Sequence, residues 1–334
     1  MKNKKLIICL LLFLSIVHAG KYGSAFLELG VSARDIAMGG STGALDSSVT
    51  SFYSNPAGLA YVQSPSCGLL YMSQFGLASY NYVGAAFPAG KLVCAANWLH
   101  YEVSNIPRRP DYFLSGNYTL EERRNEITSH QGKGFGTFNN YEDGLFFSIA
   151  GIKRFQVYLD RLYDYLKIEI PWGINIKTIR KKLDDSSAGG IGADIGGRIR
   201  FNFGRLTGLK KIGHLSFGLC ARDFTGTNIY WSSKYKDKIP IDIRAALGFE
   251  QPVRIIDSGI SVSVEHNSKY NEIRYGAEYQ FKNILYLRAG YDNLNTNYGC
   301  GINVKVFQIL SRIDYAFLKH ELGQCHRIGL ALCF

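Results

Sequence analysis

The chain lacks the features of most enzymes and of helical membrane proteins. No apolar run of about 20 residues, the length of a membrane-spanning helix, follows its short apolar N-terminus, and the mean hydropathy is −0.05. No nucleophile elbow, phosphate-binding loop, HExxH sequence or CxxC pair is present. The seven cysteines match no zinc or haem spacing. We therefore expect no catalytic residue, no metal site and no cofactor.

Prolines are also few, at eight against 36 glycines, whereas aromatic residues are many, with 22 Tyr, 20 Phe and three Trp. Many strands joined by tight turns suit this proline and glycine content. A transmembrane barrel needs aromatic girdles, and its mean hydropathy is ordinary because lipid-facing and lumen-facing residues alternate. The composition is typical of such a barrel.

The N-terminus predicts export. Three lysines among the first five residues precede an apolar run over residues 6–17, and Val17-His18-Ala19 offers a small-residue cleavage site. The run is too short for a helical anchor, which needs about 20 residues. We expect a signal peptide over residues 1–19, cleaved near Ala19. Export also makes nucleic acid an improbable partner for the formal charge of +11, so we expect lipid head groups or an acidic protein segment instead.

Apolar residues recur at period two along much of the chain, which predicts strands. The clearest segments are 92–98, 194–203, 215–219, 260–265, 283–291 and 302–306. The last residues, 328–334, alternate in the same way and end on Phe334, which is similar to the assembly signal of bacterial outer-membrane barrels. An ordinary edge strand is the alternative, although a bare apolar edge invites unwanted pairing. Residues 63–334 are enough for 12, 14 or 16 membrane-crossing strands.

Two segments do not read as plain strands. Residues 102–143 are polar and predict a long outer loop, with a short helix near 120–127. Residues 155–166 carry apolar side chains at a spacing closer to helical than alternating. An amphipathic helix and a strand with a long connection both remain open for that segment.

Residues 30–60 are rich in small residues and carry few charges. Asn55 is placed to cap a short helix that has Pro56 at its first position. Gly39 and Gly40 indicate tight turns or close backbone approach. We expect a compact plug over residues 20–62 that folds against something larger.

The plug sequence resembles that of PorV/PorQ-type outer-membrane barrels, which are relatives of the FadL fatty-acid transporters. The resemblance rests on GVSARDIAMGG at 30–40 and on YSNPAGLA at 53–60, and strand motifs in family order extend it over most of residues 22–334. It implies an all-β fold, a transmembrane antiparallel barrel of about 14 strands over 63–334 with an N-terminal hatch over 20–62. It also implies the bacterial outer membrane and type IX protein secretion, in which the lumen and outer loops engage exported cargo proteins or other secretion components.

The expected hatch and lumen contacts are Arg34, Asp35, Met38, Gly39, Gly40, Asp46, Tyr53, Asn55 and Pro56. A charge inside a barrel needs a partner, so Arg34 would lock the hatch by pairing with a lumen carboxylate such as Asp194 or Glu265. If the lumen is wet, Arg34 could instead be a solvated loop residue.

Two other functions remain open from the sequence. A FadL-like transporter of hydrophobic small molecules would have an apolar pocket between hatch and wall, lined by side chains such as Met38, Phe52 and Tyr53. A purely structural barrel would be filled by its hatch. Pocket shape separates the three functions, because protein cargo needs a wide polar mouth.

Overall fold

A computed structural model describes residues 24–108, 118–129, 136–159, 164–209, 212–320 and 323–334. The predicted signal peptide lies outside these residues. The helices are η1 (Ala25–Glu28), α2 (Ala33–Ala37), α3 (Ser51–Ser54), η2 (Pro56–Tyr61), α4 (Leu120–Ser129), α5 (Phe203–Thr207) and η4 (Arg254–Ile256). The strands are β1 (Ser66–Gln74), β2 (Ala78–Ala89), β3 (Leu92–Pro107), β4 (Thr137–Leu159), β5 (Asp164–Leu183), β6 (Ser186–Asn202), β7 (His214–Arg222), β8 (Thr227–Trp231), β9 (Lys236–Ile239), β10 (Asp242–Val253), β11 (Ser258–Asn267), β12 (Glu272–Phe281), β13 (Leu285–Tyr291), β14 (Thr296–Val306), β15 (Ile309–His320) and β16 (Gly323–Cys333).

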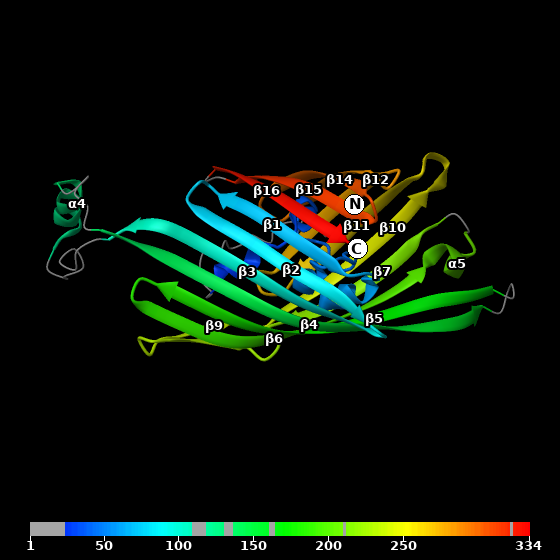
Figure 1. Ribbon diagram of the computed structural model, residues 1–334, viewed down its shortest axis with the longest axis horizontal. Coiled ribbons are helices and arrows are strands. Elements are labelled where there is room, and N and C mark those ends of the chain that lie inside the picture. Colours follow the sequence, from blue (N-terminus) through cyan, green and yellow to red (C-terminus); the bar gives the residue numbers. More distant parts are fainter. Residues whose placement is uncertain (1–23, 109–117, 130–135, 160–163, 210–211, 321–322) are drawn as a thin grey trace, which may run out of the picture.

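The strands form one closed antiparallel barrel (Figure 1). The first and last strands complete the ring, since β1 pairs with β16 from Ser66 opposite Cys333 onward. Strands β7 and β8 lie one after the other along β6, and β9 and β10 continue each other beside them. Each of these two pairs is one wall strand with a break, and Pro240, which has no N–H to donate, lies in the second break. The sixteen assigned strands therefore make fourteen wall strands, the number that the resemblance to PorV/PorQ-type barrels implied and one of the three that the chain length allowed.

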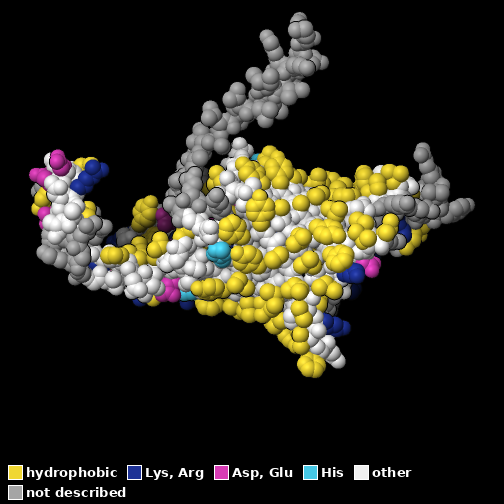
Figure 2. All heavy atoms as spheres, turned by 90° about the horizontal axis from the view of Figure 1, so that it is seen from above, with side chains coloured by type: hydrophobic (Ala, Val, Ile, Leu, Met, Phe, Trp, Pro, Cys, Tyr) yellow, Lys and Arg dark blue, Asp and Glu magenta, His cyan; other side chains and the backbone are white. Residues whose placement is uncertain are grey.

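The wall is apolar outside and polar inside. Along β11, Ile260 and Val262 are 45% and 42% exposed, whereas Glu265 on the other face is 1% exposed. Apolar side chains cover the middle of the outer surface in Figure 2, and the charged side chains in that view lie toward its two ends. A soluble protein would bury these apolar faces. The structure is therefore that of a membrane barrel, and the alternation predicted from the sequence is confirmed.

The barrel has two rims. We call the end where β1 begins and β16 finishes the C-terminal rim, and the other end the far rim. Helix α4, close to the predicted helix at 120–127, lies beyond the far rim on the connection between β3 and β4 (Figure 1). Those two strands run further than expected, so the predicted loop over 102–143 is too long. No helix among the described residues is both long and apolar enough to cross a membrane.

The described parts of the segment 155–166 are strand, not helix. Strand β4 continues to Leu159 and β5 begins at Asp164, with residues 160–163 outside the described part of the chain. Val157 and Tyr158 are residue types that favour strands over helices. Cross-strand pairing with β5, from Phe155 opposite Ile168 to Leu159 opposite Asp164, overrides the helical spacing.

We predict that an arginine on the outer face will destabilise the barrel. Val262→Arg places a charge in the hydrocarbon region and should lower the free energy of unfolding by about 2–4 kcal/mol. The measurement is equilibrium unfolding in guanidinium with the barrel folded in lipid vesicles. Ile255→Arg is the control, because Ile255 is 96% exposed in η4 at the C-terminal rim and should tolerate the charge. Equal effects of the two substitutions would contradict a lipid-facing Val262.

Candidate functional site

Residues 24–62, which we call the inner segment, lie within the barrel and are almost wholly buried. The expected cap is present: the Asn55 side chain accepts a hydrogen bond from the Ala57 N–H (3.0 Å), with Pro56 opening η2. Asn55 also donates to the wall, to the carbonyl of Gly197 (3.2 Å). The capping residue therefore both starts the helix and attaches it to β6.

Glycines allow the inner segment to lie directly on the wall. Gly39 has φ +66°, and a Cβ there would lie 2.6 Å from the carbonyl oxygen of Tyr291. Wall glycines serve the same purpose, since a Cβ at Gly290 would meet Met38 and one at Gly173 would meet Pro56, both within 2.4 Å. Close backbone approach is thus the main role of glycine at these contacts.

Arg34 makes the main ion pair of the inner segment with β12. Its Nη2 and Nε lie 2.8 and 3.0 Å from the two carboxylate oxygens of Glu278, a bidentate geometry. Our expectation that Arg34 pairs with Asp194 or Glu265 was wrong. Asp194 instead binds the buried Lys177 (2.7 Å), and Glu265 accepts from the backbone N–H of Gly43 (2.9 Å).

Glu278 is the centre of a larger ion-pair network. Besides Arg34, its carboxylate contacts Arg288 (2.6 Å) and Arg312 (3.5 Å) from the neighbouring wall. Arg34 lies 3.5 Å from Asp46 of the inner segment. Three cations thus share one wall carboxylate, and Arg34 is the one that ties the inner segment to it.

Other predicted residues serve the inner segment itself. The Asp35 carboxylate accepts a hydrogen bond from the Thr42 hydroxyl, and Asp46 accepts from the hydroxyls of Ser48 (2.8 Å) and Thr50 (3.1 Å). A Cβ added at Gly40 would lie 3.0 Å from the guanidinium of Arg274 on β12. The structure therefore places all nine predicted residues within the inner segment, inside the barrel.

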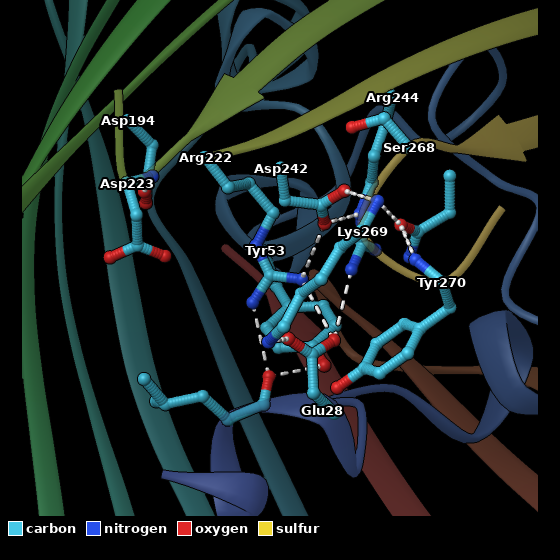
Figure 3. A network of polar contacts seen from close by, with 12 residues as sticks. Glu28, Tyr53, Asp194, Arg222, Asp223, Asp242, Arg244, Ser268, Lys269 and Tyr270 are labelled. Carbon is cyan, nitrogen blue, oxygen red and sulfur yellow. Dashed lines mark hydrogen bonds and ion pairs between the residues drawn. The ribbon is translucent and has the colours of Figure 1, made fainter. Parts of the chain in front are cut away.

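A second charged cluster, absent from our sequence-based prediction, surrounds Glu28 of η1 (Figure 3). Its carboxylate lies 2.9 Å from a nitrogen of Lys269, 3.0 Å from one of Arg244 and 3.3 Å from one of Arg222. Burial by itself would raise the pKa of Glu28, but these three positive charges outweigh it and hold that pKa well below its usual value. Asp242, 2.7 Å from Arg244, is the nearby wall carboxylate. Glu28 is therefore ionised and binds the start of the inner segment to β7, β10 and the turn after β11.

Tyr53 joins this cluster to the rest of the segment. The Arg222 guanidinium lies 4.9 Å from the centre of the Tyr53 ring, within range of a cation–π contact. The Tyr53 hydroxyl donates to the carbonyl of Leu27 (2.7 Å) and accepts from the N–H of Gly30 (3.0 Å). Tyr53 thus holds two distant parts of the inner segment together.

The opposite side of the lumen is apolar. Phe52 stacks on Tyr82 of β2 (5.8 Å between ring centres) and packs edge-on against Phe146 of β4 (5.1 Å). The inner segment contributes Phe26, Leu27, Val49, Phe52 and Leu59 to this cluster; the wall contributes Leu70, Met72, Tyr80, Tyr82, Leu99, Phe146 and Ile179. We call this cluster the apolar sector. Wall strands β1 to β5 supply most of its large side chains, and the same buried cluster extends to Ala188, Ile229, Ile239, Ala316 and Cys325 on β6, β8, β9, β15 and β16. The charged clusters around Glu278 and Glu28 lie against other strands than β1 to β5.

Two cavities lie near the rims. One, of about 280 Å³, is at the C-terminal rim between β5 and β6; the other, of about 410 Å³, is at the far rim beside Arg108 and Asp184. Neither is lined by the inner segment. The described residues hold no cluster of His, Cys, Asp or Glu that could bind a metal ion.

Comparison with solved structures finds other barrels. The toluene transporter TbuX of Ralstonia pickettii is 12% identical, with 91% of this chain and 97% of that chain covered and a TM-score of 0.44. The CymD monoaromatic hydrocarbon channel (10% identity, 91% and 96% coverage, TM-score 0.42) and a mutant of the TodX monoaromatic hydrocarbon channel (11%, 90% and 96%, 0.44) also match. No known protein family and no curated protein matches the chain. Likenesses this loose carry no argument about function.

We predict that Glu278→Gln will loosen the inner segment. Removing the carboxylate leaves Arg34 with Asp46 at 3.5 Å alone, while Arg288 and Arg312 keep Asp314 at 2.8 and 3.2 Å, so the cost lies below the roughly 3–5 kcal/mol of a fully orphaned buried charge. Hydrogen exchange of backbone amides in residues 30–40 should become faster. Asp184→Asn is the control, because its partner Arg108 lies beside it at the far rim, both side chains are partly exposed, and the cavity next to them is not lined by the inner segment. Unchanged exchange in Glu278→Gln would show that the pair does not hold the segment.

Proposed function

We propose that the protein is a gated transporter of hydrophobic small molecules in the bacterial outer membrane, reached by export and signal cleavage near Ala19, and that the inner segment is its gate. The apolar sector is the observation that carries this proposal. A pore for polar solutes is lined by polar groups and water. Here five neighbouring wall strands contribute aliphatic and aromatic side chains to one cluster with the inner segment, beside the buried polar residues Asn97, Asn175 and Lys177. This cluster offers favourable burial to an apolar molecule.

The inner segment occupies the lumen in this structure, which suits a closed gate and also suits a purely structural barrel. The manner of attachment favours the gate. The inner segment is built of short helices and turns, and wall strands pair with one another in the described ladders, none of which includes residues 24–62. It is held by ion pairs, single hydrogen bonds and apolar packing, so it can move without breaking a strand ladder.

One of the three residues expected to line the apolar pocket lies elsewhere. Phe52 and Tyr53 belong to the buried apolar cluster, but Met38 packs against the wall glycines Gly276 and Gly290 away from it. An apolar molecule that enters the apolar sector would therefore compete with Phe52 for Tyr82 and Phe146. Displacement of Phe52 is the step that would open the path.

Protein secretion of PorV/PorQ type, our first expectation from the sequence, lacks such an observation. A folded cargo domain needs a wide polar mouth, and the two cavities of about 280 and 410 Å³ are far too small for one. We therefore retain the transport of hydrophobic small molecules, which the sequence left open as the alternative.

Uptake by intact cells tests the proposal. Cells with a lipopolysaccharide-covered outer membrane would express the protein, and an intracellular sensor would report entry of toluene or of a long-chain fatty acid. Expression should raise the uptake rate of at least one of these apolar probes. Expression that raises uptake of neither apolar probe would contradict the proposal.

We predict that Phe52→Ala will raise this uptake several-fold. The truncation removes the side chain that fills the space between Tyr82 and Phe146 and weakens the hold of the inner segment on the wall. Phe87→Ala is the matched control, because Phe87 lies on β2 next to the same sector but is 54% exposed on the outer face. If both variants change uptake equally, the effect does not come from the lumen.

A further inference from the structure

Strand β4 has an edge at the C-terminal rim that no other described strand covers. Its pairing with β3 ends where Leu92 lies opposite Gly151, whereas its pairing with β5 continues to Leu159 opposite Asp164. Residues 152–159, which we call the rim edge, thus have a strand partner on one side only. Figure 1 shows the ends of β4 and β5 extending past the neighbouring β3.

The rim edge projects beyond the part of the wall that crosses the bilayer. Strand β4 has 23 residues, whereas a wall strand needs about 9–11 to cross the hydrocarbon core. At about 3.3 Å per residue and a tilt of about 40°, residues 152–159 continue for about 20 Å past the start of β3. Open strand edges do not occur in hydrocarbon, because lipid offers no hydrogen bonds to the backbone. The rim edge therefore lies in the head-group or aqueous region.

The rim edge presents both backbone groups and apolar side chains. Every second residue of an antiparallel strand turns its N–H and C=O toward the same edge, so half of these groups face away from β5. Phe155 and Val157, which share one face, are 49% and 46% exposed, and Tyr158 on the other face is 79% exposed. An exposed apolar edge of this kind is a template for another strand.

The charge of the rim edge is positive. Lys153 and Arg154 lie near its start, and residues 152–159 include no aspartate or glutamate. Glu169 lies 3.2 Å from Arg154 but also 3.4 Å from Arg200, so these two arginines share its carboxylate. The side chain of Lys153 is exposed and has no carboxylate partner among the described residues. A partner with acidic residues beside Lys153 therefore complements the edge.

We propose that the rim edge binds an extended segment of another protein as an added antiparallel strand. The segment has alternating apolar residues, and acidic residues at the C-terminal end that reaches Lys153. Antiparallel pairing is slightly the stronger per residue and continues the pattern of the wall. The main-chain hydrogen bonds supply affinity, and the contacts of alternate side chains with Phe155 and Val157 set the register.

Two other occupants fit the rim edge less well. Lipid covers apolar side chains but leaves the outward N–H and C=O groups without strand partners. A second copy in the same bilayer is related by a two-fold axis along the membrane normal. Strands tilted by about 40° from that axis cross at about 80°, so two rim edges do not align for pairing.

The test is titration of a synthetic peptide against the purified, folded barrel in phosphatidylcholine nanodiscs, with fluorescence anisotropy as the readout. The labelled peptide alternates valine with threonine and ends on two glutamates. We expect saturable binding with a dissociation constant below about 1 mM. Absence of binding at this concentration would overturn the proposal. The same outcome in nanodiscs, with binding in detergent, would show that lipid covers the edge.

Backbone methylation of the peptide separates strand addition from unspecific adhesion. One version carries N-methyl groups on its valines and a second carries them on its threonines. All valine N–H groups of an extended strand face one edge and all threonine N–H groups face the other. One version should therefore bind like the parent peptide, and the other should bind about tenfold more weakly or worse. Equal binding of the two versions would contradict strand pairing.

Substitutions locate the site on the barrel. Val157→Lys puts a charge on the edge and should weaken binding about tenfold or more. Ile255→Lys is the matched control, because Ile255 is 96% exposed at the same rim but lies in η4, and it should leave the affinity unchanged. Lys153→Glu should weaken binding of the parent peptide and strengthen binding of a version that ends on two lysines.

Equal effects of Val157→Lys and Ile255→Lys would overturn the proposal. Gln156→Cys, in a background without the native cysteines, reports on a second copy, since Gln156 is exposed on the rim edge. A disulfide-linked dimer of this variant in the nanodisc would assign the edge to a second copy and overturn the proposal. Because every readout is binding or cross-linking, the result is independent of whether hydrophobic molecules are transported.

Discussion

Compensation of the charges inside the barrel is the constraint on which the rest of the structure depends. The wall turns its apolar side chains outward, so its arginines, lysines and carboxylates face the lumen, where an unpaired charge is costly. The inner segment supplies part of the missing compensation. Glu28 adds a negative charge among three wall cations that Asp242 only partly compensates, and Arg34 pairs with the wall carboxylate Glu278. Wall and inner segment therefore need each other for charge balance.

The two sides of the lumen hold the inner segment by different interactions, ion pairs on one side and apolar packing on the other. The charged side fixes the position of the inner segment, because ion pairs require particular distances and directions. The apolar side is held by packing, which imposes no fixed directions, and an apolar molecule in the place of Phe52 would restore contact with Tyr82 and Phe146. A segment that is oriented by charges on one side and replaceable on the other has the physical properties of a gate. Its short helices and its lack of strand pairing with the wall among the described residues let it move as a unit.

The sequence predicted the features that depend on local pattern. The alternation in residues 260–265 correctly predicted which side chains of β11 face outward and which face inward. The Asn55-Pro56 pair correctly predicted the cap of η2. It could show that Arg34 needs a carboxylate but not which one, because the choice of Glu278 over Glu265 depends on where the segment lies against β12. Glu28 was missed because its partners come from three places far along the chain. The strand count was open because breaks divide two wall strands.

Movement of the inner segment is the central claim, and a reversible cross-link tests it most directly. A Cβ at Gly329 of β16 would lie 3.6 Å from that of Ala33 in α2, which suits a disulfide between Ala33→Cys and Gly329→Cys in a background without the native cysteines. We expect uptake of the apolar probe to stop when the cross-link is oxidised and to return when it is reduced. Equal uptake in both states would contradict a gate that opens by displacement of the inner segment.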